Sequence, residues 1–227
     1  IALFGILLAV PAVVFNNMWI HPDSLVFLFI VLTFFFLDKD DLRFGKSFYL
    51  AALFCGLAVA TKLIGLFFFI AIPYYIFLGW RQERLDTRKA LIVAASFVTI
   101  MFSVFVLANP FLYWASERTF ALKTQTDLHD AMGGGFIVAY NNSPLLWLQV
   151  IEKWYGLLIF VLLSAVALIV GMLKGERKLL NQLIALWAFP FMAYISFALV
   201  IRAKHFPLPI LLPMFSALPA YFTFFAP

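Results

Sequence analysis

The sequence predicts an all-α fold, a polytopic transmembrane helical bundle of about eight spans, and two observations lead to this prediction. Hydrophobic residues make up 65% of the 227 positions, charged residues only 12%, and the mean hydropathy is +1.03. The apolar residues also lie in continuous runs, whereas the strands of a β-barrel alternate polar and apolar positions. Because a bilayer core about 30 Å thick needs roughly 20 apolar residues per helix, each run is a candidate span.

Eight runs fit this description, although some of them are short. They cover residues 1–20, 24–37, 48–61, 63–80, 90–109, 154–173, 179–201 and 206–226. We interpret residues 1–227 as a single transmembrane domain. The chain opens at Ile1 within an apolar run and closes at Pro227 just after another, so we expect it to be an internal fragment of a longer protein.

Basic residues are concentrated in three short connectors between the runs. Ten of the sixteen Lys and Arg residues lie in segments 38–47, 80–89 and 174–178. The positive-inside rule places such loops in the cytoplasm. Orientation in a membrane therefore explains the net charge of +5, and we expect no nucleic-acid partner. Cys55 is the single cysteine, which excludes an internal disulfide or a thiolate metal cluster.

This orientation requires residues 48–80 to cross the membrane and return, because a basic connector flanks them on each side. The sequence thus predicts a hairpin with Lys62 at its outer tip. The alternative is one helix of 33 residues, about 50 Å long at 1.5 Å per residue, which is too long for one span. It would also place two basic connectors on opposite sides of the membrane.

The lengths of two runs predict that charged residues lie below the outer surface. Runs 24–37 and 48–61 have 14 residues each, about 21 Å as helix, which is shorter than the bilayer core. With their inner ends held at Asp38 and Ser47, Asp23 and Lys62 would be recessed in a hydrated or ligand-filled cavity. In the alternative, flanking residues extend both helices and the two charges reach the surface.

Residues 110–153 form the longest polar segment, and we expect an outer-face loop with interfacial helices. The Asn109-Pro110 pair ends the preceding run, since the residue before proline is disfavoured in a helix. Aromatic residues among polar ones between 111 and 120 are typical of a helix lying in the membrane interface. Three glycines at 133–135 break this helix, and Ser143-Pro144 begins another. Such a loop is suited to gating a lipid entrance, or it simply connects two spans.

The orientation collects unusual polar residues on the outer side: His21, Asp23, Lys62, Asn109, His129, Arg202, Lys204 and His205. Lys62, Arg202 and Lys204 are cations where the positive-inside rule disfavours them, and they fit a clamp for a phosphate group. The alternative is pairing with helix dipoles and lipid headgroups. Asp23 is interpreted either as a helix cap or as a carboxylate that orients an incoming hydroxyl.

A metal site has weaker support in the sequence. His129 and Asp130 lie in Asp-Leu-His-Asp at 127–130 and are weak candidate ligands, without a recognised metal spacing. A divalent metal is the one candidate cofactor, and no cofactor is firmly expected. A solvated histidine is the alternative interpretation.

Four segments, in this order along the chain, resemble a known group of enzymes. They are Asn-Met-Trp-Ile-His-Pro-Asp-Ser at 17–24, Gly-Leu-Ala-Val-Ala-Thr-Lys at 56–62, Leu-Ala-Asn-Pro-Phe at 107–111 and Arg-Ala-Lys-His-Phe-Pro-Leu-Pro-Ile-Leu-Leu-Pro at 202–213. Over about residues 1–220 the chain resembles membrane glycosyltransferases of the GT-C superfamily. The resemblance is to the branch of dolichyl-phosphate-mannose protein mannosyltransferases and lipid A aminoarabinose transferases.

The resemblance implies an inverting glycosyltransferase of the mannosyltransferase-like type. It would move a sugar from a polyprenyl-phosphate-linked donor to a protein, lipid or glycan acceptor on the periplasmic or luminal face. The protein would be an integral, multi-pass membrane protein of a bacterial or archaeal plasma membrane, or of the endoplasmic reticulum. Membrane lipids would surround the protein, and they are also expected partners.

By position, the resemblance also implies roles for individual residues. Donor phosphate-binding residues are Lys62, Arg202, Lys204 and His205, although Phe206-Pro207 stands where the family often has a tyrosine. Asp23 matches an acidic residue of the family and has a supporting role. His21 and Asn109 are expected to contact the acceptor or to support the residues that bind the donor. The family carries its catalytic Asp in a large loop after the first helix, so the general base is expected upstream of Ile1.

Two other functions fit the same residues. A lipid-linked sugar transporter or flippase would need a polar path through the membrane, and the runs are polar only near their outer ends. A non-catalytic membrane subunit would use the outer residues only to bind lipid headgroups. An Asp-Glu pair in an upstream outer loop would favour the enzyme.

Overall fold

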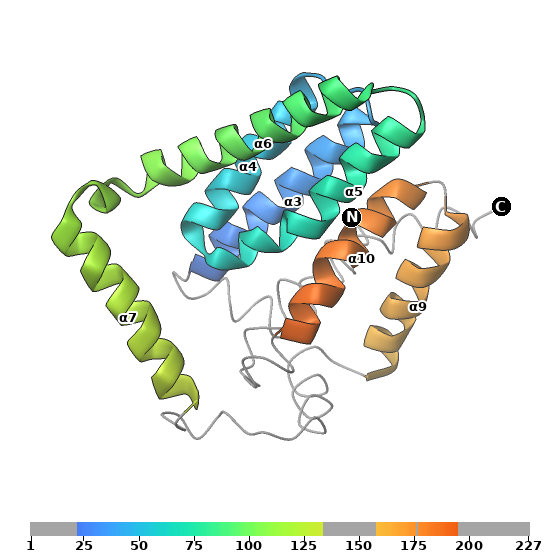
Figure 1. Cartoon of the computed structure of the whole chain (residues 1–227). Coiled ribbons are helices and arrows are strands. Elements are labelled where there is room, and N and C mark those ends of the chain that lie inside the picture. The colour runs from blue at the N-terminus through green and yellow to red at the C-terminus, as the bar shows by residue number, and fades with distance from the viewer. Residues whose placement is uncertain (1–21, 134–157, 176, 195–227) are drawn as a thin grey trace.

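The computed structural model of this chain describes residues 22–133, 158–175 and 177–194, and within them every regular element is a helix (Figure 1). The elements are α3 (Pro22–Asp40), α4 (Lys46–Thr61), the 3₁₀ helix η1 (Leu63–Phe67), α5 (Phe68–Arg81), α6 (Thr87–Ala108), the 3₁₀ helix η2 (Pro110–Tyr113), α7 (Ala115–Gly133), α9 (Leu158–Lys174) and α10 (Lys178–Ala193). The predicted all-α fold is thus confirmed for the described part of the chain.

The predicted apolar runs agree with these helices. Six runs fall wholly or partly within the described residues, and each of the six coincides with a helix in its described part. Runs 1–20 and 206–226 lie outside the described residues, so a total of eight spans stays a prediction. Residues Leu63–Arg81 and helix α6 are each long and apolar enough to cross a membrane.

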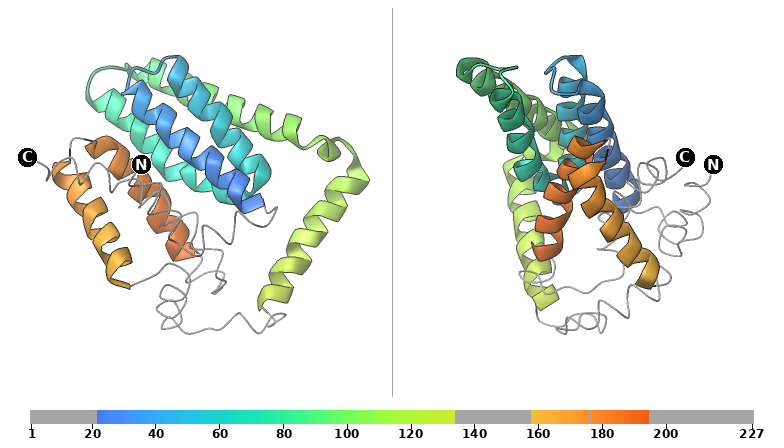
Figure 2. Two further views of the ribbon diagram at one scale, coloured as in Figure 1. Left: turned by 180° about the vertical axis from the view of Figure 1, so that it is seen from behind. Right: turned by 90° about the vertical axis from the view of Figure 1, so that its right-hand side faces the viewer.

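Helices α3 to α6 pack side by side as a bundle, with α4 against both α3 and α6 (Figures 1 and 2). The crossing of α4 and α6 is close because Gly56 has no side chain. A Cβ atom there would lie 2.8 Å from the carbonyl oxygen of Met101 and 2.8 Å from the Cβ of Val104. Small residues at such a contact let two apolar helices approach closely, as is common between membrane helices.

Helix α10 docks against α3, η1 and α5, and α9 packs on α10. The centre of this contact is Trp187, which is fully buried. Its ring centroid lies 6.3 Å from that of Phe34 on α3 and 6.1 Å from that of Phe68 on α5. Aromatic pairs at these spacings add to the stabilisation from the buried apolar area.

The turn between α3 and α4 has an unusual backbone held by one buried acid. Asp41, Leu42 and Phe44 all have positive φ, between 49° and 57°, which is unfavourable for residues other than glycine. Asp40 is 3% exposed, and its carboxyl oxygens accept hydrogen bonds from the backbone N–H groups of Phe44, at 2.8 Å, and Gly45, at 2.9 Å. Asp40 therefore fixes the turn and the start of α4.

The predicted hairpin of residues 48–80 is confirmed. Helix α4 ends at Thr61, Lys62 adopts an extended conformation with φ −160° and ψ 137°, and η1 then leads into α5. The return path of α5 brings Tyr75 back to the start of α4, where its ring lies 5.9 Å from that of Phe48. A single helix of 33 residues is excluded by this geometry.

The predicted lengths of the first two described helices are wrong. Helix α3 has 19 residues, about 28 Å, and α4 has 16 residues, about 24 Å, against the 14 expected for each. Flanking polar residues join both helices, because Pro22 suits the first turn and Asp40 completes hydrogen bonds at the start of α4. The length of α3 therefore gives no support to a recessed Asp23, since α3 nearly matches a bilayer core.

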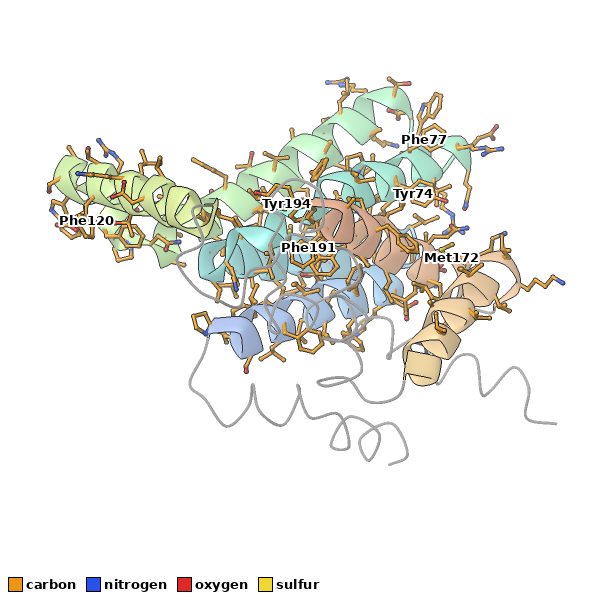
Figure 3. The ribbon with its side chains drawn as sticks, turned by 90° about the horizontal axis from the view of Figure 1, so that it is seen from below. Tyr74, Phe77, Phe120, Met172, Phe191 and Tyr194 are labelled. Atoms are coloured by element: carbon orange, nitrogen blue, oxygen red, sulfur yellow. The ribbon has the colours of Figure 1, made fainter. Side chains whose placement is uncertain are left out.

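Helix α7 extends away from the bundle and contacts η2 but none of α3 to α6 closely (Figure 1). Figure 3 shows Phe120 of α7 far from the labelled residues of α5 and α10. Phe120 is 68% exposed and Trp114, just before α7, is 60% exposed. The interfacial helix predicted after residue 110 thus exists as a helix with exposed aromatic residues. The segment around Ser143-Pro144 lies outside the described residues.

Candidate functional site

The bundle has two chemically different ends. At the first, which we call the connector end, the three basic connectors lie together. Arg84 donates to the carbonyl oxygen of Asp41 at 3.1 Å, and Arg177 forms an ion pair with Asp38 at 3.0 Å. These contacts join the loops after α3, α5 and α9, as expected for connectors on one side of a membrane.

At the opposite end, which we call the Lys62 end, three helix termini meet. The turn between α3 and α4 is short, so the start of α3 lies beside the end of α4. Helix α6 runs parallel to α4, since Phe48 contacts Phe97 and Gly56 meets Val104. The end of α6 at Ala108 therefore shares this side, and Asp23, Lys62 and Asn109 all occupy backbone positions there.

Lys62 stands at the break between two apolar helical segments. Its backbone N–H donates to the carbonyl oxygen of Ala58 at 2.9 Å, which ends α4, and its side chain is half-buried. Gly65 allows the chain to turn here, because a Cβ atom at this position would lie 2.6 Å from the backbone nitrogen of Val59. The tight packing of η1 on the last turn of α4 thus sets the position of Lys62.

Asn109 has a structural contact that the sequence did not predict. Its side-chain amide donates to the carbonyl oxygen of Phe105 at 2.8 Å and so completes the last turn of α6. Helix ends leave such carbonyl groups without a partner within the helix. Asn109 is half-buried at the Lys62 end, and its expected role toward an acceptor stays a prediction.

The remaining predicted site residues are only partly visible. His21, Arg202, Lys204 and His205 lie outside the described residues. Asp23 is in the first turn of α3, while His129 and Asp130 are in α7; for these three the structure gives the backbone position alone. Among the residues that the structure describes, no three His, Cys, Asp or Glu side chains are close enough to hold a metal ion.

The structure adds a groove that the sequence reasoning missed. It has a volume of about 520 Å³ and lies between α4, η1, α5 and α6. Its floor includes the buried residues Cys55, Phe68 and Phe97, and its rim includes the exposed Phe69 and Leu91. The regular spacing of Thr87, Ala90, Ala94, Phe97 and Met101 along α6 was the available signal, since these positions share one helical face.

Over the residues that the structure describes, these features define an all-helical bundle with two helices suited to crossing a membrane, one basic end, and an apolar groove along one side. Compared with known protein families, curated proteins and solved structures, the chain matches none of them.

Proposed function

We propose that this chain is part of a multi-pass membrane protein whose described helices α3 to α6, α9 and α10 lie in the bilayer. Helix α6 gives the strongest support. Its 22 residues span about 33 Å, close to the thickness of a bilayer core. Only Val93 and Phe97 are buried, and Phe102 and Leu107 are 61% and 71% exposed. Such an apolar surface is stable in lipid and unfavourable in water.

Within that membrane, we propose an inverting glycosyltransferase that takes its sugar from a polyprenyl-phosphate donor. The observation that carries this proposal is the position of Lys62. This cation interrupts an otherwise apolar hairpin at the end of the bundle farthest from the basic connectors. Charged residues at membrane depth are costly, and they commonly mark a functional site.

The chemistry gives each residue a distinct task. Cleavage of a glycosyl-phosphate bond leaves negative charge on the departing phosphate, and a preplaced cation stabilises that charge as it forms. Lys62 has this role, together with Arg202, Lys204 and His205. A carboxylate deprotonates the acceptor hydroxyl, and we assign this base to a segment upstream of Ile1. Asp23 supports the site electrostatically, and we assign His21 and Asn109 to binding the acceptor or to supporting the donor-binding residues.

The test compares two lysines at opposite ends of the bundle in the full-length protein. Lys62 is half-buried at the Lys62 end, and Lys174 is exposed at the connector end. Purified protein in lipid is assayed for sugar transfer from radiolabelled polyprenyl-phosphate donors. We expect Lys62→Ala to reduce transfer by about 100-fold or more, as for loss of a group that stabilises transition-state charge. Lys174→Ala should retain nearly full activity.

A third variant separates charge from packing. Lys62→Arg keeps the cation and should retain part of the activity, with a melting midpoint equal to that of the parent protein. Equal loss of transfer in Lys62→Ala and Lys174→Ala would exclude the phosphate clamp. Binding of the donor without transfer, by a full-length protein that has an upstream acidic loop, would favour the non-catalytic subunit.

A further inference from the structure

The apolar groove between α5 and α6 has a length suited to a lipid chain. Its lining on α5 runs from Phe68 to Trp80, which is about 18 Å of helix. One leaflet of a bilayer core is about 15 Å thick, half of the whole. The volume of about 520 Å³ also lies within the range of about 300 to 1,000 Å³ for small-molecule sites.

Helix α6 packs closely on α4, and small side chains leave the space between α6 and α5 unfilled. Ala90, Ala94 and Gly65 line it where larger residues would fill the space. Phe69 and Val98 form part of its open rim and are 62% and 57% exposed. The groove therefore opens on the side of the bundle that faces lipid under the membrane placement proposed above.

The groove is closed at the connector end by a polar contact. The indole N–H of Trp80, the last lining residue of α5, donates to the hydroxyl of Thr87, the first lining residue of α6, at 3.3 Å. Trp80 is 47% exposed. Tryptophan is enriched where the apolar core of a membrane meets its headgroup layer. The contact thus marks the level at which a lipid headgroup would lie.

Two arginines flank this closed end. Arg81 follows Trp80, Arg88 follows Thr87, and both are exposed. Two other nearby basic residues have partners. Arg84 donates to the backbone carbonyl oxygen of Asp41, and Lys89 forms an ion pair with Asp86 at 3.5 Å. Within the described residues, no hydrogen bond or ion pair engages the guanidinium groups of Arg81 and Arg88. They are therefore available to an external anion, with the exposed Glu83 as the nearby opposing charge.

We propose that the groove binds an anionic phospholipid, with one acyl chain along α5 and α6 and the phosphate headgroup between Arg81 and Arg88. Charge complementarity selects this occupant over a neutral lipid. It also places the headgroup at the connector end, opposite to Lys62. The proposal rests on the membrane placement above and not on sugar transfer.

The test measures lipid binding to the purified full-length protein by native mass spectrometry. Phosphatidylglycerol is compared with phosphatidylcholine of the same acyl chains. We expect a clear preference for phosphatidylglycerol in the parent protein. Each basic residue near a membrane surface contributes about fivefold to anionic lipid binding, about 1 kcal/mol. The double variant Arg81→Ala with Arg88→Ala should therefore weaken phosphatidylglycerol binding about 30-fold and leave phosphatidylcholine binding unchanged.

A second pair of variants tests the groove itself. Ala94 lines the groove, whereas its neighbour Ala95 is exposed outside it. Ala94→Phe should block lipid binding, and Ala95→Phe should not. Unchanged binding in the arginine double variant, or equal effects of the two phenylalanine variants, would overturn the proposal. Loss of phosphatidylglycerol binding on Lys62→Ala instead would place the headgroup at the Lys62 end and also overturn it. Sugar transfer is measured separately, so its failure does not affect this result.

Discussion

The hydroxyl of Tyr75 on α5 donates a hydrogen bond of 2.8 Å to the carboxyl group of Asp40 at the end of α3. The same hydroxyl accepts a hydrogen bond of 2.6 Å from the backbone N–H of Leu42. Because Asp40 also binds the start of α4, this pair holds three helices together at the connector end. The three residues of the turn with positive φ keep that conformation through these contacts.

Removal of the Asp40 carboxyl group should strongly destabilise the protein. Asp40→Ala leaves the N–H groups of Phe44, Gly45 and Phe48 without their acceptor, and each such loss costs about 1–3 kcal/mol where the group is buried. We expect a total loss of about 3 kcal/mol or more in unfolding free energy. Thermal or denaturant unfolding in detergent measures it.

Matched variants separate this network from general effects of charge. Tyr75→Phe should cost less, about 1–2 kcal/mol, since it removes one hydroxyl. Asp41→Asn is the control, because Asp41 is exposed and asparagine tolerates positive φ. If Asp40→Ala and Asp41→Asn lower stability equally, Asp40 does not have the structural role described here.

The packing of η1 against α4 gives a second prediction. A Cβ atom at Gly65 would lie 2.6 Å from the backbone nitrogen and 3.0 Å from the Cα of Val59, and backbone atoms cannot move aside cheaply. Gly65→Ala should therefore destabilise the protein by about 1–3 kcal/mol, the usual cost of overpacking. Gly45→Ala is a suitable control, because its nearest neighbour would be 3.8 Å away. Equal melting midpoints for the two variants would contradict the predicted clash.

The start of α6 gives a prediction about pH. The side chain of Asp86 accepts a hydrogen bond of 2.8 Å from the backbone N–H of Lys89, and this bond lowers the pKa of the Asp86 carboxyl group. A lowered folded-state pKa means that the ionised group stabilises the fold above its ordinary pKa, near 4, and that this contribution disappears as the pH falls through the lowered value.

We therefore expect Asp86→Ala to reduce the melting midpoint slightly at pH 7 and to have less effect at pH 3. Asp86→Ser is the matched variant, because serine caps a helix without titrating in this range. The difference in melting midpoint between Asp86→Ser and Asp86→Ala should not depend on pH. A constant difference between the parent protein and Asp86→Ala from pH 7 to pH 3 would show that ionisation of Asp86 is unimportant.

The sequence predicted the path of the chain better than the details of its ends. Apolar runs located the described helices other than η2 and α7, and the charge pattern predicted both the hairpin at Lys62 and the meeting of the basic connectors. Helix lengths were underestimated, because polar residues such as Asp40 and Lys46 belong to the helices. A polar residue can extend a helix by forming hydrogen bonds with the unpaired backbone groups at its end. A hydropathy pattern does not detect such a residue.

The roles of Asp40 and Asn109 could not be predicted for a related reason. Asp40 appeared to be one of several acids in a charged connector, and its burial depends on Tyr75, which lies 35 positions away. The Asn109-Pro110 pair predicts the end of a helix, but not that the Asn109 amide completes the last turn of α6. The groove depends on the relative placement of α5 and α6, which no local pattern specifies. Arg81 and Arg88 were attributed to orientation alone for the same reason.

The central claim is that the Lys62 end and the connector end lie on opposite sides of a membrane, and cysteine labelling tests it most directly. The natural Cys55 is fully buried and should stay unlabelled. Ser116→Cys, just beyond η2, and Arg43→Cys, in the connector after α3, introduce exposed thiols at the two ends. Sealed vesicles of known orientation are then treated with a maleimide that cannot cross membranes. We expect Arg43→Cys to react only from the cytoplasmic face and Ser116→Cys only from the other; reaction of both from one face would contradict the account.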